Sequence, residues 1–202
     1  VTTWILSRRS RRHFAVPQAS LDGVQASLSE LISLDLVPLL YAALGIIWRL
    51  HSFTAYTGLI TLGAAIIGIG IGDRRRDWKA LSYLSVAAIS IAGYEIVIYQ
   101  MLQKSGGSEA DGLTILGLVA ATIALIYRIL VWFWQNKRRN TIFNLAVTEI
   151  LSIAHIHWAI GSALTILALG TSVNSKPQLG HITIFVTLIL VGYAIFEGRN
   201  NN

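Results

Sequence analysis

Four ionisable side chains stand inside long apolar stretches and are the first candidates for chemistry: Glu95, Glu149, His155 and His157. An ionised side chain inside a bilayer costs about 2.5 to 3.5 kcal/mol on insertion scales, so such a carboxylate should face protein, water or a partner, or stay protonated. Imidazole exchanges protons near neutral pH. Together these groups could form a substrate or proton pathway through a membrane.

Glu95 shares one helical face with smaller or hydroxyl-bearing residues at steps of three and four, among them Ser85, Ala92 and Tyr99. This pattern makes Glu95 the best single candidate for a functional residue. The alternative is a protonated glutamic acid that hydrogen-bonds a neighbouring helix.

The two histidines of the sequence His-x-His do not predict a metal site. A helix turns about 100° per residue, so His155 and His157 point nearly opposite ways and cannot bind one metal together. A haem held by His155 and His181 is disfavoured because the two lie at different depths. Each imidazole either makes a structural hydrogen bond or takes part in a proton relay.

Arg128 lies two turns from the end of its apolar stretch. Its side chain could extend to the lipid headgroups, or it could pair with Glu149.

Ala64, Gly68 and Gly72 stand four residues apart within an apolar stretch. A phosphate-binding glycine loop would have to leave a strand and open a helix in water, which this context does not allow. The three small residues instead predict a face on which another helix packs closely.

No arrangement typical of an enzyme can be assembled from the sequence. The chain has no cysteine, which excludes thiol catalysis and thiolate metal sites. It also lacks a Ser-His-Asp order, a nucleophile elbow, a zincin motif and a nucleotide loop. We therefore favour a protein that is not an enzyme, with an intramembrane enzyme or redox protein as the third alternative, and we expect no cofactor and no metal.

The composition indicates which elements must position these groups. Apolar residues make up 54% of the 202 residues and charged residues only 13%, against roughly 25% charged in a soluble domain. A membrane helix needs roughly 20 apolar residues. The sequence predicts an all-α transmembrane bundle of about six crossings, at residues 36–49, 53–72, 80–103, 112–134, 143–169 and 179–196.

Lysine and arginine predict the orientation of this bundle. They cluster at residues 8–12, 74–79, 137–139 and 199, which six crossings would place on one side. Positive loops stay in the cytoplasm, so both termini are expected to be cytoplasmic. The net charge of +6 follows from this bias and requires no nucleic-acid partner.

The chain divides into two predicted regions. Residues 1–35 form a cytoplasmic basic segment whose residues 17–35 have the spacing of a helix lying along the membrane surface, with a plain connector as the alternative. Residues 36–202 form the transmembrane domain.

Three stretches carry a resemblance: 53–65 (FTAYTGLITLGAA), 127–134 (YRILVWFW) and 154–162 (AHIHWAIGS). They resemble uncharacterised multi-pass membrane proteins that are common in cyanobacteria and similar to a larger bacterial membrane family of unknown function. The resemblance implies a multi-helix membrane protein, often longer than this chain, and carries no site residue across.

Two functions agree with these observations. The first is a transporter-like protein that uses the intramembrane glutamates and histidines. The second is a structural or assembly subunit of a membrane complex. The expected partners are the lipid bilayer and either other membrane subunits or further copies of the chain. Convergence of the four groups on one cavity favours transport, and dispersal favours the structural role.

Overall fold

The fold is almost entirely helical, which confirms the predicted all-α class. A computed structural model of the chain describes residues 21–103, 107–137, 141–173 and 177–200. The described helices are α2 (Leu21–His51), α3 (Thr57–Arg74), α4 (Lys79–Gln103), α5 (Glu109–Asn136), α6 (Val147–Ser172) and α7 (Gly180–Asn200).

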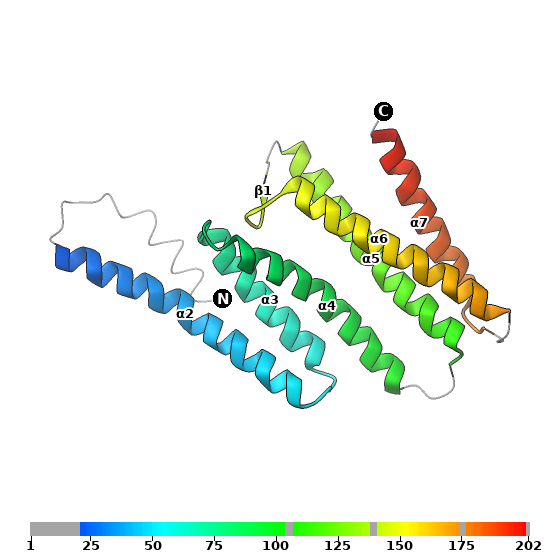
Figure 1. The fold of residues 1–202 in the computed structure, drawn as a ribbon, viewed down its shortest axis with the longest axis horizontal. Coiled ribbons are helices and arrows are strands. Elements are labelled where there is room, and N and C mark those ends of the chain that lie inside the picture. Colours follow the sequence, from blue (N-terminus) through cyan, green and yellow to red (C-terminus); the bar gives the residue numbers. More distant parts are fainter. Residues whose placement is uncertain (1–20, 104–106, 138–140, 174–176, 201–202) are drawn as a thin grey trace.

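The helices lie roughly side by side, and each runs back along its predecessor (Figure 1). Helix α2 forms one edge of the molecule, α3 and α4 follow, and α5 and α6 come next, with α7 at the other edge. Helices α3 and α4 pack on each other, and so do α5 and α6, while α4 contacts α5 to join the two groups.

Five of these helices, α3 to α7, are long and apolar enough to cross a membrane. They correspond to five of the six predicted crossings, although α3 begins at Thr57 and not at residue 53. The remaining one, at 36–49, lies in the second half of α2. There Asp35 and Arg49 bracket an apolar stretch shorter than the roughly 20 residues that a crossing needs. A sixth crossing therefore stays a prediction.

Helix α2 continues through the expected boundary at residue 35 without a break. It includes Pro38, which removes one backbone hydrogen bond but is tolerated in membrane helices. Its first half extends beyond the neighbouring ends of α3 and α4 (Figure 1). The expected surface helix and the expected first crossing thus belong to one element.

A small hairpin precedes α6, and it corrects the predicted start of the fifth crossing at residue 143. Strands β1 (Thr141–Ile142) and β2 (Leu145–Ala146) pair antiparallel. The turn residues Phe143 and Asn144 both have positive φ, at 53° and 64°, as a two-residue hairpin turn requires. The helix therefore begins only at Val147.

Small residues set the spacing of the two closest helix pairs. A Cβ built on Gly58 of α3 would lie 2.9 Å from the carbonyl oxygen of Ala92 in α4. A Cβ built on Gly161 of α6 would lie 3.3 Å from the Cβ of Ala120 in α5. These close approaches are what holds helices together where lipid removes the hydrophobic driving force.

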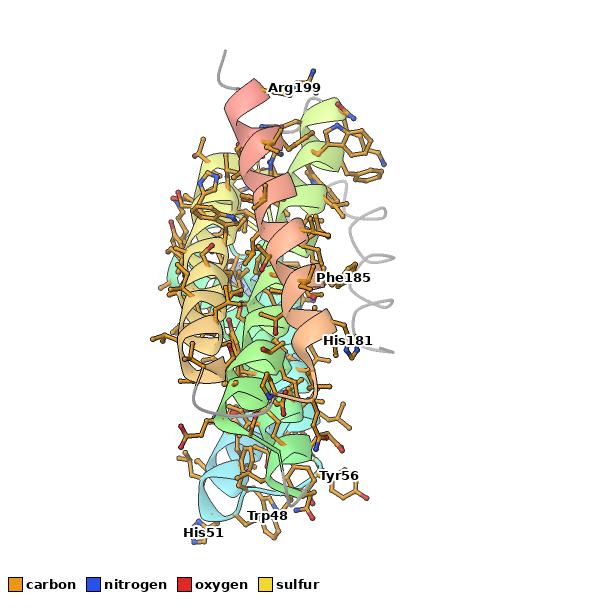
Figure 2. All side chains as sticks on the ribbon, turned by 90° about the vertical axis from the view of Figure 1, so that its right-hand side faces the viewer. Trp48, His51, Tyr56, His181, Phe185 and Arg199 are labelled. Atoms are coloured by element: carbon orange, nitrogen blue, oxygen red, sulfur yellow. The ribbon has the colours of Figure 1, made fainter. Side chains whose placement is uncertain are left out.

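The alternating directions bring the basic segments of the described chain to one end. Asn144 Nδ2 donates to the carbonyl oxygen of Arg76 at 3.2 Å, which joins the turn between α3 and α4 to the hairpin. In Figure 2, Arg199 marks this end, whereas Trp48, His51 and Tyr56 lie at the other end. We call the two ends the basic end and the distal end. Which side of a membrane each one faces stays a prediction.

Candidate functional site

Glu95 lies in a buried contact among α2, α3 and α4. Its carboxylate pairs with Arg49 of α2 and accepts a hydrogen bond from Thr61 Oγ1 of α3 at 2.6 Å. The residue is only 7% exposed. It stands eight residues before Gln103, about 12 Å along the helix from the distal end. The carboxylate is thus held by two helices, neither of which is its own.

Glu149 lies at the opposite end of the bundle, in the first turn of α6. Its carboxylate pairs with Lys79 Nζ of α4 at 2.7 Å and accepts from the backbone N–H of Ala146 at 2.7 Å. The second contact satisfies one of the backbone donors that a helix start leaves open. Glu149 therefore caps its own helix and fastens it to α4.

His157 is buried where α6 meets α4 and α5. Its Nδ1 is 2.9 Å from the carbonyl oxygen of Ile153. A carbonyl only accepts, so the neutral ring carries its proton on Nδ1. The ring stacks on Tyr94 at 6.2 Å and lies 6.0 Å from the ring of Tyr127. His157 thus packs as an aromatic side chain between helices.

Tyr127 extends this contact toward α4. Its hydroxyl donates to the carbonyl oxygen of Val86 at 3.0 Å and lies 3.1 Å from Ser90 Oγ. The pair of hydrogen bonds ties α5 to α4 within the apolar part of the bundle.

His155 faces the other side of α6, as the step of about 100° per residue requires. Its side chain is 45% exposed, and its ring meets the ring of Tyr193 in α7 edge-on at 5.9 Å. Its Nε2 lies 3.9 Å from Glu197 Oε2, which is too far for a hydrogen bond. His155 and His157 therefore belong to different environments.

Arg128 pairs with Glu197 of α7, and not with Glu149 as the sequence suggested. The guanidinium carbon also lies 4.9 Å from the centre of the Phe196 ring. Arg128 is only 6% exposed, so it is buried among protein side chains. Glu197 was missed in the sequence because it follows the last apolar stretch. The sequence did indicate this partner, because Glu197 is the one carboxylate that the last crossing places at the basic end.

Asp35 is a second partner that sequence reasoning missed. It is 7% exposed and pairs with Arg74 Nη2 at 2.6 Å and with Arg75 Nε at 2.9 Å. Two arginines that were interpreted only as orientation signals therefore also join α3 to α2.

Asp111 joins the starts of two helices at the distal end. Its carboxylate accepts from the backbone N–H groups of Leu179 at 2.8 Å and Gln178 at 3.2 Å, next to the first turn of α7. Its own N–H donates to Ser108 Oγ at 3.2 Å, which forms a capping box at the start of α5.

The predicted packing face is turned inward. Any side chain at Gly68 or Gly72 would collide with the hydroxyls of Ser85 and Ser82 in α4. Ala64 is only partly covered, and its neighbour Ala65 is the buried one, at 2% exposure. This face thus packs within the chain and is not open to another protein.

The four predicted pathway residues therefore do not meet. Glu95 contacts α2 and α3, Glu149 contacts α4 at the basic end, His157 contacts α4 and α5, and His155 contacts α7. Within the described ranges, no three His, Asp or Glu side chains are grouped as a metal ion would require.

Comparison with known proteins adds no further assignment. No protein-family model, no curated protein and no solved structure matches the chain. The assignment of function therefore depends on the contacts described above.

Proposed function

We propose that the chain is a structural or assembly subunit of a membrane complex, and that charged side chains in its bundle join its helices to one another. One observation carries this proposal: three glutamates of the apolar helices are each paired with a cation of a different helix. Glu95 pairs with Arg49, Glu149 with Lys79, and Glu197 with Arg128.

The pairing supports a structural role because a pathway needs polar groups that change partners. An ion pair inside the bundle is expensive to break, since removal of one partner leaves an uncompensated buried charge. Groups on a transport route should also share a polar cavity. Glu95, Glu149, His155 and His157 lie in separate helix contacts. Their dispersal favours a structural role over transport.

The Arg49 and Glu95 pair provides a direct test. Either single reversal, Arg49→Glu or Glu95→Arg, should lower the thermal unfolding midpoint in detergent because two like charges then meet. The double reversal restores opposite charges and should recover most of the loss. Loss without recovery in the double variant would contradict a pairing role.

Assembly itself is tested in native membranes. The tagged chain, extracted in mild detergent, should migrate in a species heavier than its own 22.1 kDa with a fixed stoichiometry. A chain that remains a monomer with normal stability and function would overturn the assembly role.

Transport is the second candidate, and one observation favours it. The Arg49 side chain is 24% exposed, so its pair with Glu95 is partly accessible, and its buried Nε has no hydrogen-bond partner within the described part of the chain. Transport predicts that Glu95→Gln and His155→Ala abolish a pH-dependent flux in proteoliposomes while expression stays normal. Equal flux in wild type and Glu95→Gln supports the structural role.

A further inference from the structure

An apolar groove follows the seam between α6 and α7. Its volume is about 260 Å³, and its walls include Trp158, Ser162, Leu169, Thr187 and Ile195. A second hollow of about 290 Å³ shares Leu169 and Thr187 with it and continues toward the distal end. The two hollows therefore adjoin each other along α6 and α7.

The hydroxyl groups in this groove have no proton to offer a ligand. Ser162 donates to the carbonyl oxygen of Trp158 at 2.9 Å, and Thr187 donates to that of Thr183 at 2.8 Å. The indole Nε1 of Trp158 likewise donates to the carbonyl oxygen of Leu190 at 2.9 Å. A long apolar tail therefore fits the groove better than a polar molecule does.

Polar groups lie about one helical turn from the groove, on the side of Trp158 that is nearer the basic end. Neither ring nitrogen of His155 has a hydrogen-bond partner among the described residues, and its side chain is 45% exposed. Beside it, the hydroxyl of Tyr193 is buried and also lacks a partner within the described ranges. Tyr193 stacks on Trp158 at 6.2 Å and so connects the groove to His155.

Charge and depth decide which head group fits here. His155 stands eight residues after Val147, about 12 Å along α6 from the basic end. A phosphate head would have to leave the interface to reach it. Glu197 Oε2 lies 3.9 Å from His155 Nε2, but its charge is already paired with Arg128, so neither residue remains as a counter-charge for a charged head group. The head must therefore be uncharged.

We propose that α6 and α7 bind an isoprenoid quinone, with its ring beside His155 and Trp158 and its tail along the groove. A quinone is uncharged, its carbonyl oxygens accept hydrogen bonds from imidazole, and its flat ring packs against aromatic side chains. The reduced quinol donates to the same imidazole instead, so both forms fit. This site is independent of the structural role proposed above.

The tail half of the site is tested with a matched pair of variants. Ser162 lines the groove, whereas the adjacent Ala163 is exposed outside it. The full chain is placed in phosphatidylcholine nanodiscs and titrated with decylubiquinone, with binding followed by tryptophan fluorescence. Ser162→Leu should weaken binding by about tenfold or more, while Ala163→Leu should bind as wild type does. Equal effects of both variants would overturn the proposal.

The head half is tested with His155→Phe, which keeps a ring against Tyr193 but removes both nitrogens. This variant should bind decylubiquinone about tenfold more weakly. Its thermal unfolding midpoint should stay near that of the wild type. Duroquinone, which lacks the tail, and dodecanol, which lacks the ring, should each compete poorly. Unchanged quinone affinity in His155→Phe, or displacement by palmitate as effective as by quinone, would refute a quinone site.

Discussion

At the scale of single residues, the structure assigns partners that the sequence could not. Periodicity placed Glu95, His155 and His157 on the correct kind of element, because a helical step fixes direction around its own axis. It could not name Arg49 or Glu197 as partners, since they lie on other helices and pairing depends on how the helices are arranged. The suggested pairing of Arg128 with Glu149 was wrong for this reason.

The buried pair of Arg128 and Glu197 yields a prediction. Glu197→Gln leaves a buried guanidinium without its counter-charge and should destabilise the fold by about 3 to 5 kcal/mol. The double variant Arg128→Met with Glu197→Leu removes both charges and should be markedly milder. Thermal unfolding in detergent compares the two.

Lys79→Met serves as the control for that series, since the Lys79 side chain is 49% exposed. Lys79→Met should lower the unfolding midpoint less than Glu197→Gln and the double variant do, because solvent screens exposed ion pairs. If Glu197→Gln lowers the unfolding midpoint no more than the double variant does, the pair does not stabilise the fold.

At the scale of elements, long apolar runs predicted the helices well, because length and hydropathy determine whether a segment can cross a bilayer. The hairpin at residues 141–146 was not predicted. Phe143 lacks the glycine or asparagine signal that such a turn usually shows at its first central position, and Asn144 alone was too weak a sign. Ile142 and Leu145 also look like the start of an apolar helix, although they belong to the two strands of the hairpin and are buried.

Asp111 provides a prediction on helix starts. Asp111→Ala removes the acceptor for the N–H groups at the start of α7 and breaks the capping box of α5, so it should cost about 1 to 2 kcal/mol. Asp111→Asn keeps one carbonyl oxygen and should cost less. Hydrogen exchange of the first turn of α7 should rise in the alanine variant, and equal exchange in all three proteins would contradict this role.

Glycine positions on α3 provide a matched test of helix packing. Gly68 faces Ser85, whereas a side chain built on Gly70 meets nothing within 4 Å. Gly68→Leu should push α3 away from α4 and lower the unfolding midpoint strongly. Gly70→Leu points to open space and should leave the midpoint near that of the wild type. A similar loss in both variants would contradict the close contact of Gly68 as the cause, because helix propensity favours leucine over glycine at both positions.

At the scale of the whole molecule, the alternation of basic segments predicted which connections share an end. The contacts of Asn144 with Arg76 and of Lys79 with Glu149 agree with that arrangement. The dispersal of the candidate residues was beyond sequence reasoning, because the depth of a residue in one helix says nothing about which neighbour it faces.

Labelling can test the orientation cleanly, since the chain has no cysteine of its own. Single variants Asp77→Cys and Lys137→Cys should react with an impermeant maleimide from the same side of a vesicle, the cytoplasmic one by the positive-inside rule. Glu109→Cys should react only from the opposite side. Labelling of residues 77 and 137 from different sides would refute the bundle topology.

The Asn144 contact also bears on how the protein is made. Helices α2, α3 and α4 hold one another through Asp35, Arg49 and Glu95, all present once residue 103 has been synthesised. Their links to the second group instead require Tyr127, Asn144 and Glu149. During synthesis the contacts among α2, α3 and α4 can therefore form first, the contact of Tyr127 with α4 can follow, and the contact of Asn144 with the turn after α3 can form only once the hairpin has been made.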